Sequence, residues 1–393
     1  MSTTVNNGEA TEVQQRNPYA MPRDYYRQFG PIDVLLRDDS VTEVMVMADR
    51  EIYVEVAGKI HLTDYKFKNE AELIAVIQRI VEAIGRKIDE DNPLCDARLA
   101  DGSRVHAAIK PAAMDGPYLT IRKFSRVPLT ADQLVEWNSC TREAFTFLKA
   151  CVEAKANILI SGGTGTGKTT FLNILSGFIP PTERIVTIED AVELQLRQRH
   201  VARLETRPPS LEGKKPISIR DLVITSLRMR PDRIIVGECR GAEALDMLQA
   251  MNTGHEGSMT TVHANSVRDA MSRVETMVLM AGYDLPTRAI RQQIASAINI
   301  FVQLERQRDG SRKVVQISEV TGMEEDTISL LDVFVFTATT DSKNRTVQWL
   351  APTGLRPRIL DRLMDMKVEP APELLALFPA LRPSQKVNWE ERF

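Results

Sequence analysis

Cysteine and long hydrophobic runs are scarce in this sequence. The four cysteines, at positions 95, 140, 151 and 239 of 393 residues, form no C-x-x-C pair, which argues against a zinc site, a redox dithiol or a disulfide framework. The longest apolar stretch, residues 294–304, is interrupted and too short to span a bilayer. Residues 1–28 have neither the basic start nor the apolar segment of a signal peptide. We therefore expect a soluble, cytoplasmic protein.

An excess of either charge is also missing. Fifty Lys and Arg residues against 53 Asp and Glu residues give a net charge of −3, so no overall positive field is present to hold a nucleic acid. Hydrophobic residues make up 43% and charged residues 26%, which excludes a disordered or low-complexity chain. The length favours two to three globular domains.

Composition and periodicity divide the chain into five predicted segments. Residues 1–28 are polar and are expected to be a flexible tail, and residues 29–125 a small α/β domain. Residues 126–134 are expected to be a linker, since Pro128 lies within them. Residues 135–345 are predicted to form a larger α/β domain, and residues 346–393 a C-terminal helical extension.

The first domain alternates between the two regular periodicities. Apolar spacing predicts helices at 32–36 and 71–84, and a single helical turn at 25–28. Alternation of apolar and polar residues predicts strands at 43–47, 52–56, 103–109 and 118–124.

The second domain contains apolar strands that are separated by helices. The predicted strands are 158–161, 185–188, 234–236 and 258–262, preceded by a helix at 143–154. Such alternation predicts a parallel sheet with helices on both faces. Residues 300–304, 313–320 and 328–336 look like antiparallel strands, and residues 360–380 look mostly helical.

A phosphate-binding loop is the strongest signal in the chain. An apolar strand runs into G-x-x-x-x-G-K-T, and a helical pattern follows. Glycines let backbone N–H groups face one anion, and the helix N-terminus adds its positive end. Lys168 is expected to reach the β- and γ-phosphates of ATP, and the Thr169 hydroxyl to bind Mg²⁺. The predicted nucleotide-binding residues of the loop are Gly162, Gly163, Thr164, Gly165, Thr166, Gly167, Lys168, Thr169 and Thr170.

Two strands of the second domain end in carboxylates. Ligands of an open parallel sheet lie at the carboxyl ends of its strands, so both acids are expected to face the phosphates. We predict that Glu189 is the base that activates water, and that Glu238 supports Mg²⁺ directly or through water. A strand-end acid can also be a solvated turn residue, but the phosphate loop upstream favours the catalytic interpretation.

Two histidines and three arginines are further candidates. His263 follows a predicted strand and could sense the γ-phosphate, whereas His255 precedes that strand and is expected at the opposite edge of the sheet. From spacing alone, a structural role is favoured for both. Arg98, Arg104 and Arg122 lie in the first domain, the last two on neighbouring predicted strands. A guanidinium suits phosphate, although strand arginines are commonly solvated.

The order of these motifs resembles the secretion ATPase superfamily, which serves type II secretion, type IV pili and type IV secretion. The stretches 228–238, with R-M-R-P-D-R-I-I-V-G-E, and 240–255 most resemble the CpaF-type branch, the motor of Tad pilus assembly. The segments D-A-R-L-A-D-G-S-R at 96–104 and L-T-I-R-K-F at 119–124 match as well. The resemblance covers about residues 30–375. The tail looks shorter than in many members, so additional N-terminal domains are not expected.

The resemblance implies a homohexamer in which each subunit has a PAS-like N-terminal domain and a RecA-like ATPase domain. Nucleotide would bind between these domains, with Arg104 and Arg122 reaching across to the phosphates. Glu189 matches the catalytic glutamate, Glu238 the acid of an atypical Walker B motif, and His263 a phosphate-facing histidine. Cys239 stands where the branch more often has an apolar residue. Arg240, which follows it, is included among the predicted nucleotide-binding residues.

We therefore expect a Mg²⁺-dependent ATPase motor that powers Tad or type IV pilus assembly, or secretion. It would lie peripheral to the inner membrane, docked on platform proteins, and no nucleic-acid partner is expected. The alternatives are a DNA-translocating P-loop motor and a small-molecule kinase or nucleotide switch. A basic cluster that includes Arg197, Arg203 and Arg207 would be the DNA groove of the first alternative, but no aromatic residues interleave it, and a solvated strand or subunit contact is favoured.

Overall fold

The computed structural model describes residues 25–124, 129–207, 215–340 and 346–379. The predicted tail up to residue 24, residues 126–128 of the predicted linker and the end of the predicted C-terminal extension lie outside these ranges. The chain divides into two compact units, Met1–Val127 and Pro128–Phe393. Within the ranges that the structure describes, no helix is long and apolar enough to cross a membrane. All four cysteines fall in these ranges, are buried and form no disulfide.

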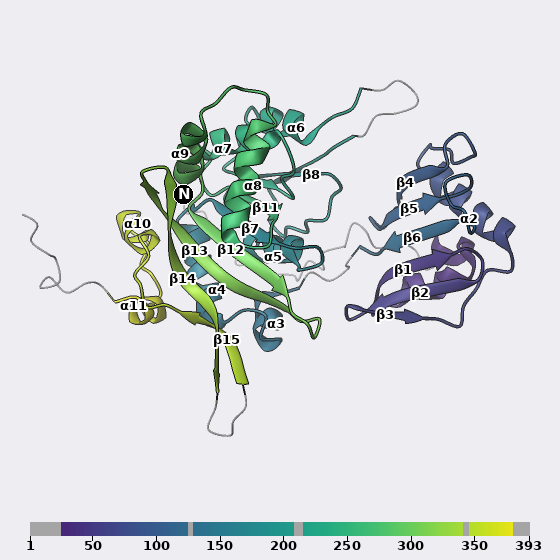
Figure 1. Cartoon of the computed structure of the whole chain (residues 1–393), viewed down its shortest axis with the longest axis horizontal. Helices are drawn as coiled ribbons and strands as arrows, with labels where there is room; N and C mark the ends of the chain where they lie inside the picture. Colours follow the sequence, from purple (N-terminus) through teal and green to yellow (C-terminus); the bar gives the residue numbers. More distant parts are fainter. Residues whose placement is uncertain (1–24, 125–128, 208–214, 341–345, 380–393) are drawn as a thin grey trace, which may run out of the picture. The chain divides into compact units, whose positions relative to one another are not determined.

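The first unit is an antiparallel sheet with helix α2 on one face (Figure 1). Its strand order is β3-β2-β1-β6-β5-β4. The apolar residues of α2 pack on the inward side chains of the strands, while Asn69 caps the helix by accepting from the Glu72 N–H at 2.9 Å. The elements are η1 (Tyr25–Gln28), η2 (Gly30–Ile32), α1 (Asp33–Arg37), β1 (Val41–Met47), β2 (Glu51–Val56), β3 (Lys59–Leu62), α2 (Glu70–Glu82), β4 (Leu94–Arg98), β5 (Arg104–Ala108) and β6 (Tyr118–Arg122).

The second unit is built on a larger mixed sheet of order β15-β14-β13-β12-β7-β11-β10-β8-β9. Six neighbouring strands run parallel, in the order β12, β7, β11, β10, β8 and β9. From β12 to β15, each strand pairs antiparallel with the next one along the chain. The strands are β7 (Ile158–Gly162), β8 (Ile185–Glu189), β9 (Val201–Glu205), β10 (Arg233–Val236), β11 (Met259–His263), β12 (Ile300–Arg306), β13 (Arg312–Glu324), β14 (Thr327–Thr340) and β15 (Thr346–Pro352).

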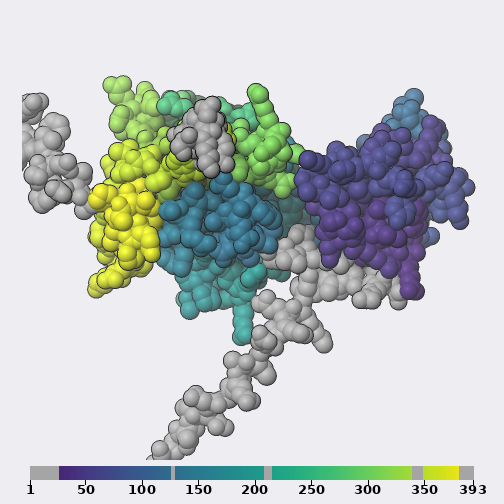
Figure 2. Space-filling view, turned by 90° about the horizontal axis from the view of Figure 1, so that it is seen from below, coloured from purple at the N-terminus to yellow at the C-terminus, as the bar shows by residue number. Residues whose placement is uncertain are grey.

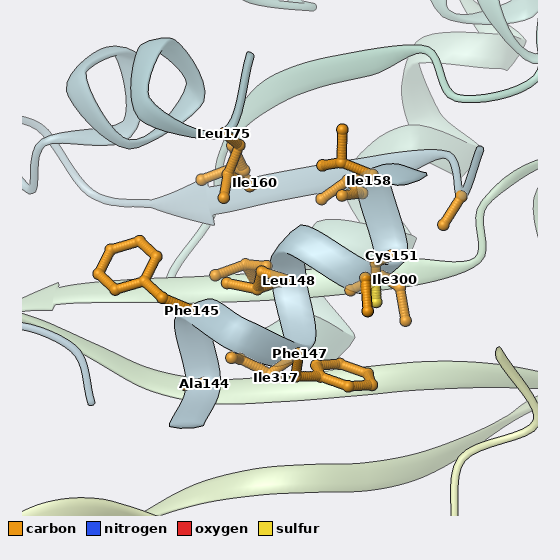
Figure 3. Packing of buried hydrophobic residues seen from close by; sticks show 14 of the residues in the cluster. Ala144, Phe145, Phe147, Leu148, Cys151, Ile158, Ile160, Leu175, Ile300 and Ile317 are labelled. Carbon is orange, nitrogen blue, oxygen red and sulfur yellow. The ribbon is translucent and has the colours of Figure 1, made fainter. Parts of the chain in front are cut away.

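Helices cover both faces of this sheet, as predicted. Neighbouring residues of β7 point to opposite sides, because Ile158 and Ile160 join the core under α4 and α5, while Leu159 joins the core under α6 to α9. Figure 3 shows Phe147, Leu148 and other α4 side chains packed toward the strands. The helices are α3 (Ala131–Glu136), α4 (Arg142–Glu153), α5 (Lys168–Ser176), α6 (Ile219–Ser226), α7 (Glu243–Asn252), α8 (Val267–Leu279), α9 (Thr287–Ala297), α10 (Ile359–Asp365) and α11 (Pro372–Leu377).

The prediction that residues 346–393 form a helical extension is wrong at its start. Thr346–Pro352 is strand β15, which pairs antiparallel with β14 and so belongs to the main sheet. Its sequence, T-V-Q-W-L-A-P, is rich in β-branched and aromatic residues, which favour a strand. The helices of this segment, α10 and α11, come later and contact α4. In the space-filling view their yellow surface lies beside the blue segment that holds α3 and α4 (Figure 2).

Candidate nucleotide site

The phosphate loop lies at the carboxyl end of the central strand β7. The strand ends at Gly162 and α5 begins at Lys168, so the residues between them form the loop. Gly167, the N-cap of α5, has φ +92°, a left-handed conformation that residues with a Cβ rarely adopt. This conformation turns the chain into the helix. The predicted strand-loop-helix context is confirmed, and it presents a helix N-terminus to an anion.

Two side chains of the loop converge on one carbonyl. Thr166 Oγ1 donates to the Gly163 oxygen at 2.9 Å, and Lys168 Nζ donates to the same oxygen at 3.0 Å. Burial lowers the pKa of the Lys168 ammonium, Glu238 opposes this shift, and Arg240 adds to it. The ammonium is therefore partly desolvated and held by a neutral carbonyl, a contact that a phosphate oxygen can replace with a stronger, charge-assisted bond.

The two predicted acids lie at the same edge of the sheet. Strand β10 pairs with β8 so that Val236 faces Ile188, and the Gly237 N–H donates to the Ile188 oxygen at 2.8 Å. A Cβ added to Gly237 would lie 3.0 Å from Cγ of Glu189, which shows that the Glu189 side chain packs against the residue before Glu238. The strand ends therefore bring both carboxylates to one place.

Glu189 is buried, and its own backbone fixes its position. The side chain is 3% exposed, and Oε2 accepts the N–H groups of Glu193 and Leu194 at 2.7 and 2.9 Å. These bonds hold the carboxylate in one orientation at the end of β8, as a group that must direct a water molecule requires.

Arg240 joins two acids at this edge. Its Nη2 lies 2.6 Å from Glu238 Oε2, and its Nη1 lies 3.2 Å from Asp190 Oδ2. The hydrogen bond to Glu238 is the main reason that the pKa of Arg240 is raised. The three side chains line a cavity of about 480 Å³, so solvent reaches the acids. Sequence reasoning missed Asp190, although the adjacent acids E-D at a strand end were a visible signal.

The two histidines lie at opposite ends of β11, as expected. His263 is the last residue of the strand and pairs with Gly162, which places it beside the first glycine of the phosphate loop. His255 precedes the strand, and its N–H donates to the Ala250 oxygen at 3.3 Å. His263 therefore lies at the carboxyl edge with the loop and the acids, and its contact with a γ-phosphate stays a prediction.

The sheet order explains how these groups come together. Across this edge, β7 carries the loop, β11 carries His263, β10 leads to Glu238, and β8 ends in Glu189. Their sequence separations are large, but parallel strands end at one edge, so the side chains gather there.

The arginines of the first unit form a row across three strands. Arg104 of β5 pairs with Arg122 of β6 on one side and with Arg98 of β4 on the other. Cross-strand partners point to the same face, so these guanidiniums share a face that α2 does not cover. The prediction that Arg104 and Arg122 lie on neighbouring strands is confirmed, and their contact with phosphate stays a prediction.

The residues at this edge fit Mg²⁺ bound with a nucleotide. Among the described residues, no three His, Cys, Asp or Glu side chains gather as a metal-only site would require. Mg²⁺ is usually held by one or two protein oxygens, several waters and the substrate phosphates. Thr169 at the start of α5 and the half-buried Glu238 supply such oxygens. Glu189, also predicted as a ligand, has one oxygen already bound to backbone N–H groups.

Comparison with known proteins agrees with this geometry. The family model of type II/IV secretion system proteins matches residues 26–343. The chain belongs to this family.

Relatives in the family come from type IV secretion and conjugation. The type IV secretion system protein PtlH of Bordetella pertussis is 37% identical over 306 residues, which cover 68% of this chain and 89% of PtlH. The conjugal transfer protein TrbB of Rhizobium radiobacter is 30% identical over 292 residues, which cover 74% of this chain and 86% of TrbB.

Two solved structures share the fold of this chain. The Legionella pneumophila ATPase DotB superposes with a TM-score of 0.52 at 22% identity, over 75% of this chain and 82% of DotB. The pilus retraction motor PilT with bound ADP superposes with a TM-score of 0.53 at 18% identity, over 88% of each chain. The predicted RecA-like ATPase fold with a smaller α/β domain before it is confirmed, as is the assignment to the secretion ATPases; the CpaF-type branch stays a prediction.

Proposed function

We propose that this family member is a Mg²⁺-dependent ATP hydrolase that works as a homohexameric motor of Tad or type IV pilus assembly or of secretion. The observation that carries the proposal is the joint placement of the phosphate loop, Glu189 and Glu238 at one edge of the sheet. A binding module needs the loop alone, whereas hydrolysis also needs a positioned carboxylate for the attacking water.

Each side chain at the edge has a separate task in this proposal. Lys168 leaves the Gly163 carbonyl and binds the β- and γ-phosphates, and Thr169 and Glu238 would hold Mg²⁺. When bound, Mg²⁺ neutralises charge that develops on the phosphate oxygens. Glu189 orients and deprotonates water, and His263, beside Gly162, faces the γ-phosphate.

Arg240 must give up part of its ion-pair network when a cation binds. It neutralises Glu238 and Asp190 in the structure, so Glu238 would have to release the guanidinium in order to hold Mg²⁺. We assign Arg240, once displaced, to the nucleotide phosphates, as the sequence predicts.

In this proposal, the arginine row of the first unit couples ATP hydrolysis to movement of that unit. The row places like charges on adjacent strands, with Glu43 of β1 directly across from Arg122, and a bound phosphate would relieve the repulsion that Glu43 leaves. Arg104 and Arg122 are therefore assigned to the γ-phosphate of a nucleotide held by the second unit. Loss of that phosphate would release the first unit, which gives a motor step.

The proposed partners are further copies of the chain and the platform proteins of an inner-membrane pilus or secretion machine. The support comes from relatives named for secretion and conjugal transfer. We place the protein in the cytoplasm, peripheral to the membrane. Pilin and platform genes beside its gene would assign the pathway, and their absence would count against the pilus role.

Phosphate release from Mg-ATP by the purified full chain tests the activity, with Lys168→Ala as the comparison. We expect turnover by the wild type and loss of nucleotide binding in the variant, because Lys168 is the half-buried ammonium at the phosphate loop. Wild-type turnover in Lys168→Ala would refute the site.

Sedimentation with ATP tests the assembly. A ring-sized particle is expected, and a monomer at every concentration would contradict the hexamer. Tight, salt-dependent binding of DNA in the same preparations would instead favour the DNA-translocating alternative.

A further inference from the structure

The hairpin of β12 and β13 lies beside the phosphate loop. Strand β12 runs parallel to β7 with Leu304 opposite Gly162, so the chain after Leu304 continues past the point where β7 turns into the loop. The hairpin turn spans residues 307–311, and its Gln307 N–H donates to the Ser311 oxygen at 2.7 Å. A Cβ added to Gly162 would lie 2.8 Å from the Leu304 oxygen, which shows how closely the two segments approach.

Two arginines of this hairpin face the loop. Arg312 Nε donates to the Gly165 oxygen at 2.9 Å, and Arg312 Cδ would lie 3.6 Å from a Cβ added to Gly167. Arg306 Nη1 would lie 3.9 Å from a Cβ added to Gly165. Arg306 and Arg312 are direct cross-strand partners, and both are exposed. Two cations are thus held side by side against a loop built for an anion, an arrangement that a bound anion would stabilise.

The hairpin and the acids lie on opposite sides of the loop. In the sheet, β12 is one neighbour of β7, while β11, β10 and β8 follow on the other side. The γ-phosphate and its water must face Glu189 and Glu238, on the β10 and β8 side. A nucleotide with its γ-phosphate on that side would extend back toward the hairpin, and its α-phosphate and nucleoside would lie there.

We propose that Arg312, assisted by Arg306, is a same-chain subsite for the α-phosphate at the nucleoside end of the nucleotide. The inference rests on the proposed nucleotide binding at the loop. Arg312 contacts the part that ATP and ADP share, so it contributes equally to binding of substrate and product. Hydrolysis itself depends on the acids on the far side.

Binding of a fluorescent ADP analogue to the full chain tests the proposal in wild type, Arg312→Ala, Arg306→Ala and Arg308→Ala. Arg308 is an exposed residue in the turn of the same hairpin and serves as the matched control. Loss of one charge-assisted contact at an exposed site should weaken ADP binding by Arg312→Ala about tenfold. Arg308→Ala should bind within twofold of wild type.

Two further readouts separate binding from a purely structural role. In Arg312→Ala, KM for ATP should rise about tenfold with kcat unchanged, the sign of a contact made equally in the ground and transition states. The dependence of ADP affinity on salt should also become shallower, because a charge contact is gone. Arg312→Lys should recover the salt dependence.

Each outcome decides something. Wild-type ADP affinity in Arg312→Ala, or weaker affinity with the wild-type salt dependence, would overturn the proposal; the latter would mean that Arg312 only shapes the loop. Absence of ADP binding by the wild type would instead refute the proposed function. An equal loss of ADP affinity in Arg308→Ala would also overturn the proposal, because any positive charge on the hairpin would then have the same effect.

Discussion

Replacement of Glu189 by glutamine is the sharpest test of the chemistry at the sheet edge. In the structure, Oε2 accepts two backbone N–H groups, and the amide oxygen of glutamine can accept the same pair. The side chain should therefore keep its position but lose its basicity. A positioned general base contributes about 100- to 10,000-fold to rate, and we expect kcat to fall by that factor.

Stability and binding should change far less than turnover. Replacing a charge-assisted pair of hydrogen bonds by neutral ones costs about 1–3 kcal/mol, which corresponds to a lower melting temperature by about 2–10 °C. Affinity for ATP should stay within about threefold, because the loop and Lys168 carry the phosphate contacts.

The assay is phosphate release at saturating Mg-ATP, together with equilibrium binding of the same nucleotide. Glu205→Gln is a matched control, since Glu205 ends β9 directly opposite Glu189 in the register but one strand farther from the loop. We expect wild-type kcat in the control. A kcat within threefold of wild type in Glu189→Gln would refute the assignment of the base.

Three other predictions follow from the structure. Gly257→Ala should lower stability by about 3–5 kcal/mol more than Gly254→Ala in thermal melts. Both glycines have positive φ, but a Cβ added at 257 would lie 1.7 Å from Nη1 of the fully buried Arg233. A Cβ added at 254 would meet nothing within 4 Å. Equal melting temperatures would contradict this. Burial raises the pKa of Glu319, so ionisation of this carboxyl group destabilises the fold as pH rises above about 4.5. The melting temperature of Glu319→Gln minus that of wild type should therefore rise between pH 4 and 7. A flat or falling difference would contradict this prediction. Arg122→Ala should cut turnover while sparing ADP binding, if Arg122 contacts the γ-phosphate, and equal loss of both would argue against that role.

The expected effect at Gly257 comes from the constraints on Arg233. Its guanidinium is ion-paired with Glu183 and donates to the Val152 oxygen at 2.9 Å, so the side chain has no room to move when a methyl group arrives. This pair lies at the amino ends of the strands, opposite the nucleotide site, and activity per folded molecule should stay unchanged.

The strands that carry the site could be predicted because their residues are apolar on both faces. Strands β7, β8 and β10 are wholly buried, and each contains at least three large aliphatic residues, in the stretches I-L-I, I-V-T-I and I-I-V. The loop and the acids follow these stretches directly, so the phosphate loop, Glu189 and Glu238 could be placed at strand ends from the sequence.

The missed features depend on contacts between distant segments. Strand β9 lies at the edge of its sheet and carries the exposed Arg203, and the short strand β3 is exposed throughout, so neither has the apolar pattern of a buried strand. Arg312 looks like an ordinary hairpin residue until the pairing of β12 with β7 is known. Strand order is set by tertiary packing, and no local pattern in one sequence specifies it.

The central claim is that ATP is held by Lys168 of the second unit and by arginines of the first. A structure of the full chain with Mg²⁺ and a non-hydrolysable ATP analogue tests this most directly. We predict that the guanidinium of Arg104 or Arg122, from the same or a neighbouring subunit, lies within hydrogen-bonding distance of the γ-phosphate while Lys168 contacts the β- and γ-phosphates. A γ-phosphate contacted only by residues of the second unit, in every subunit, would contradict it.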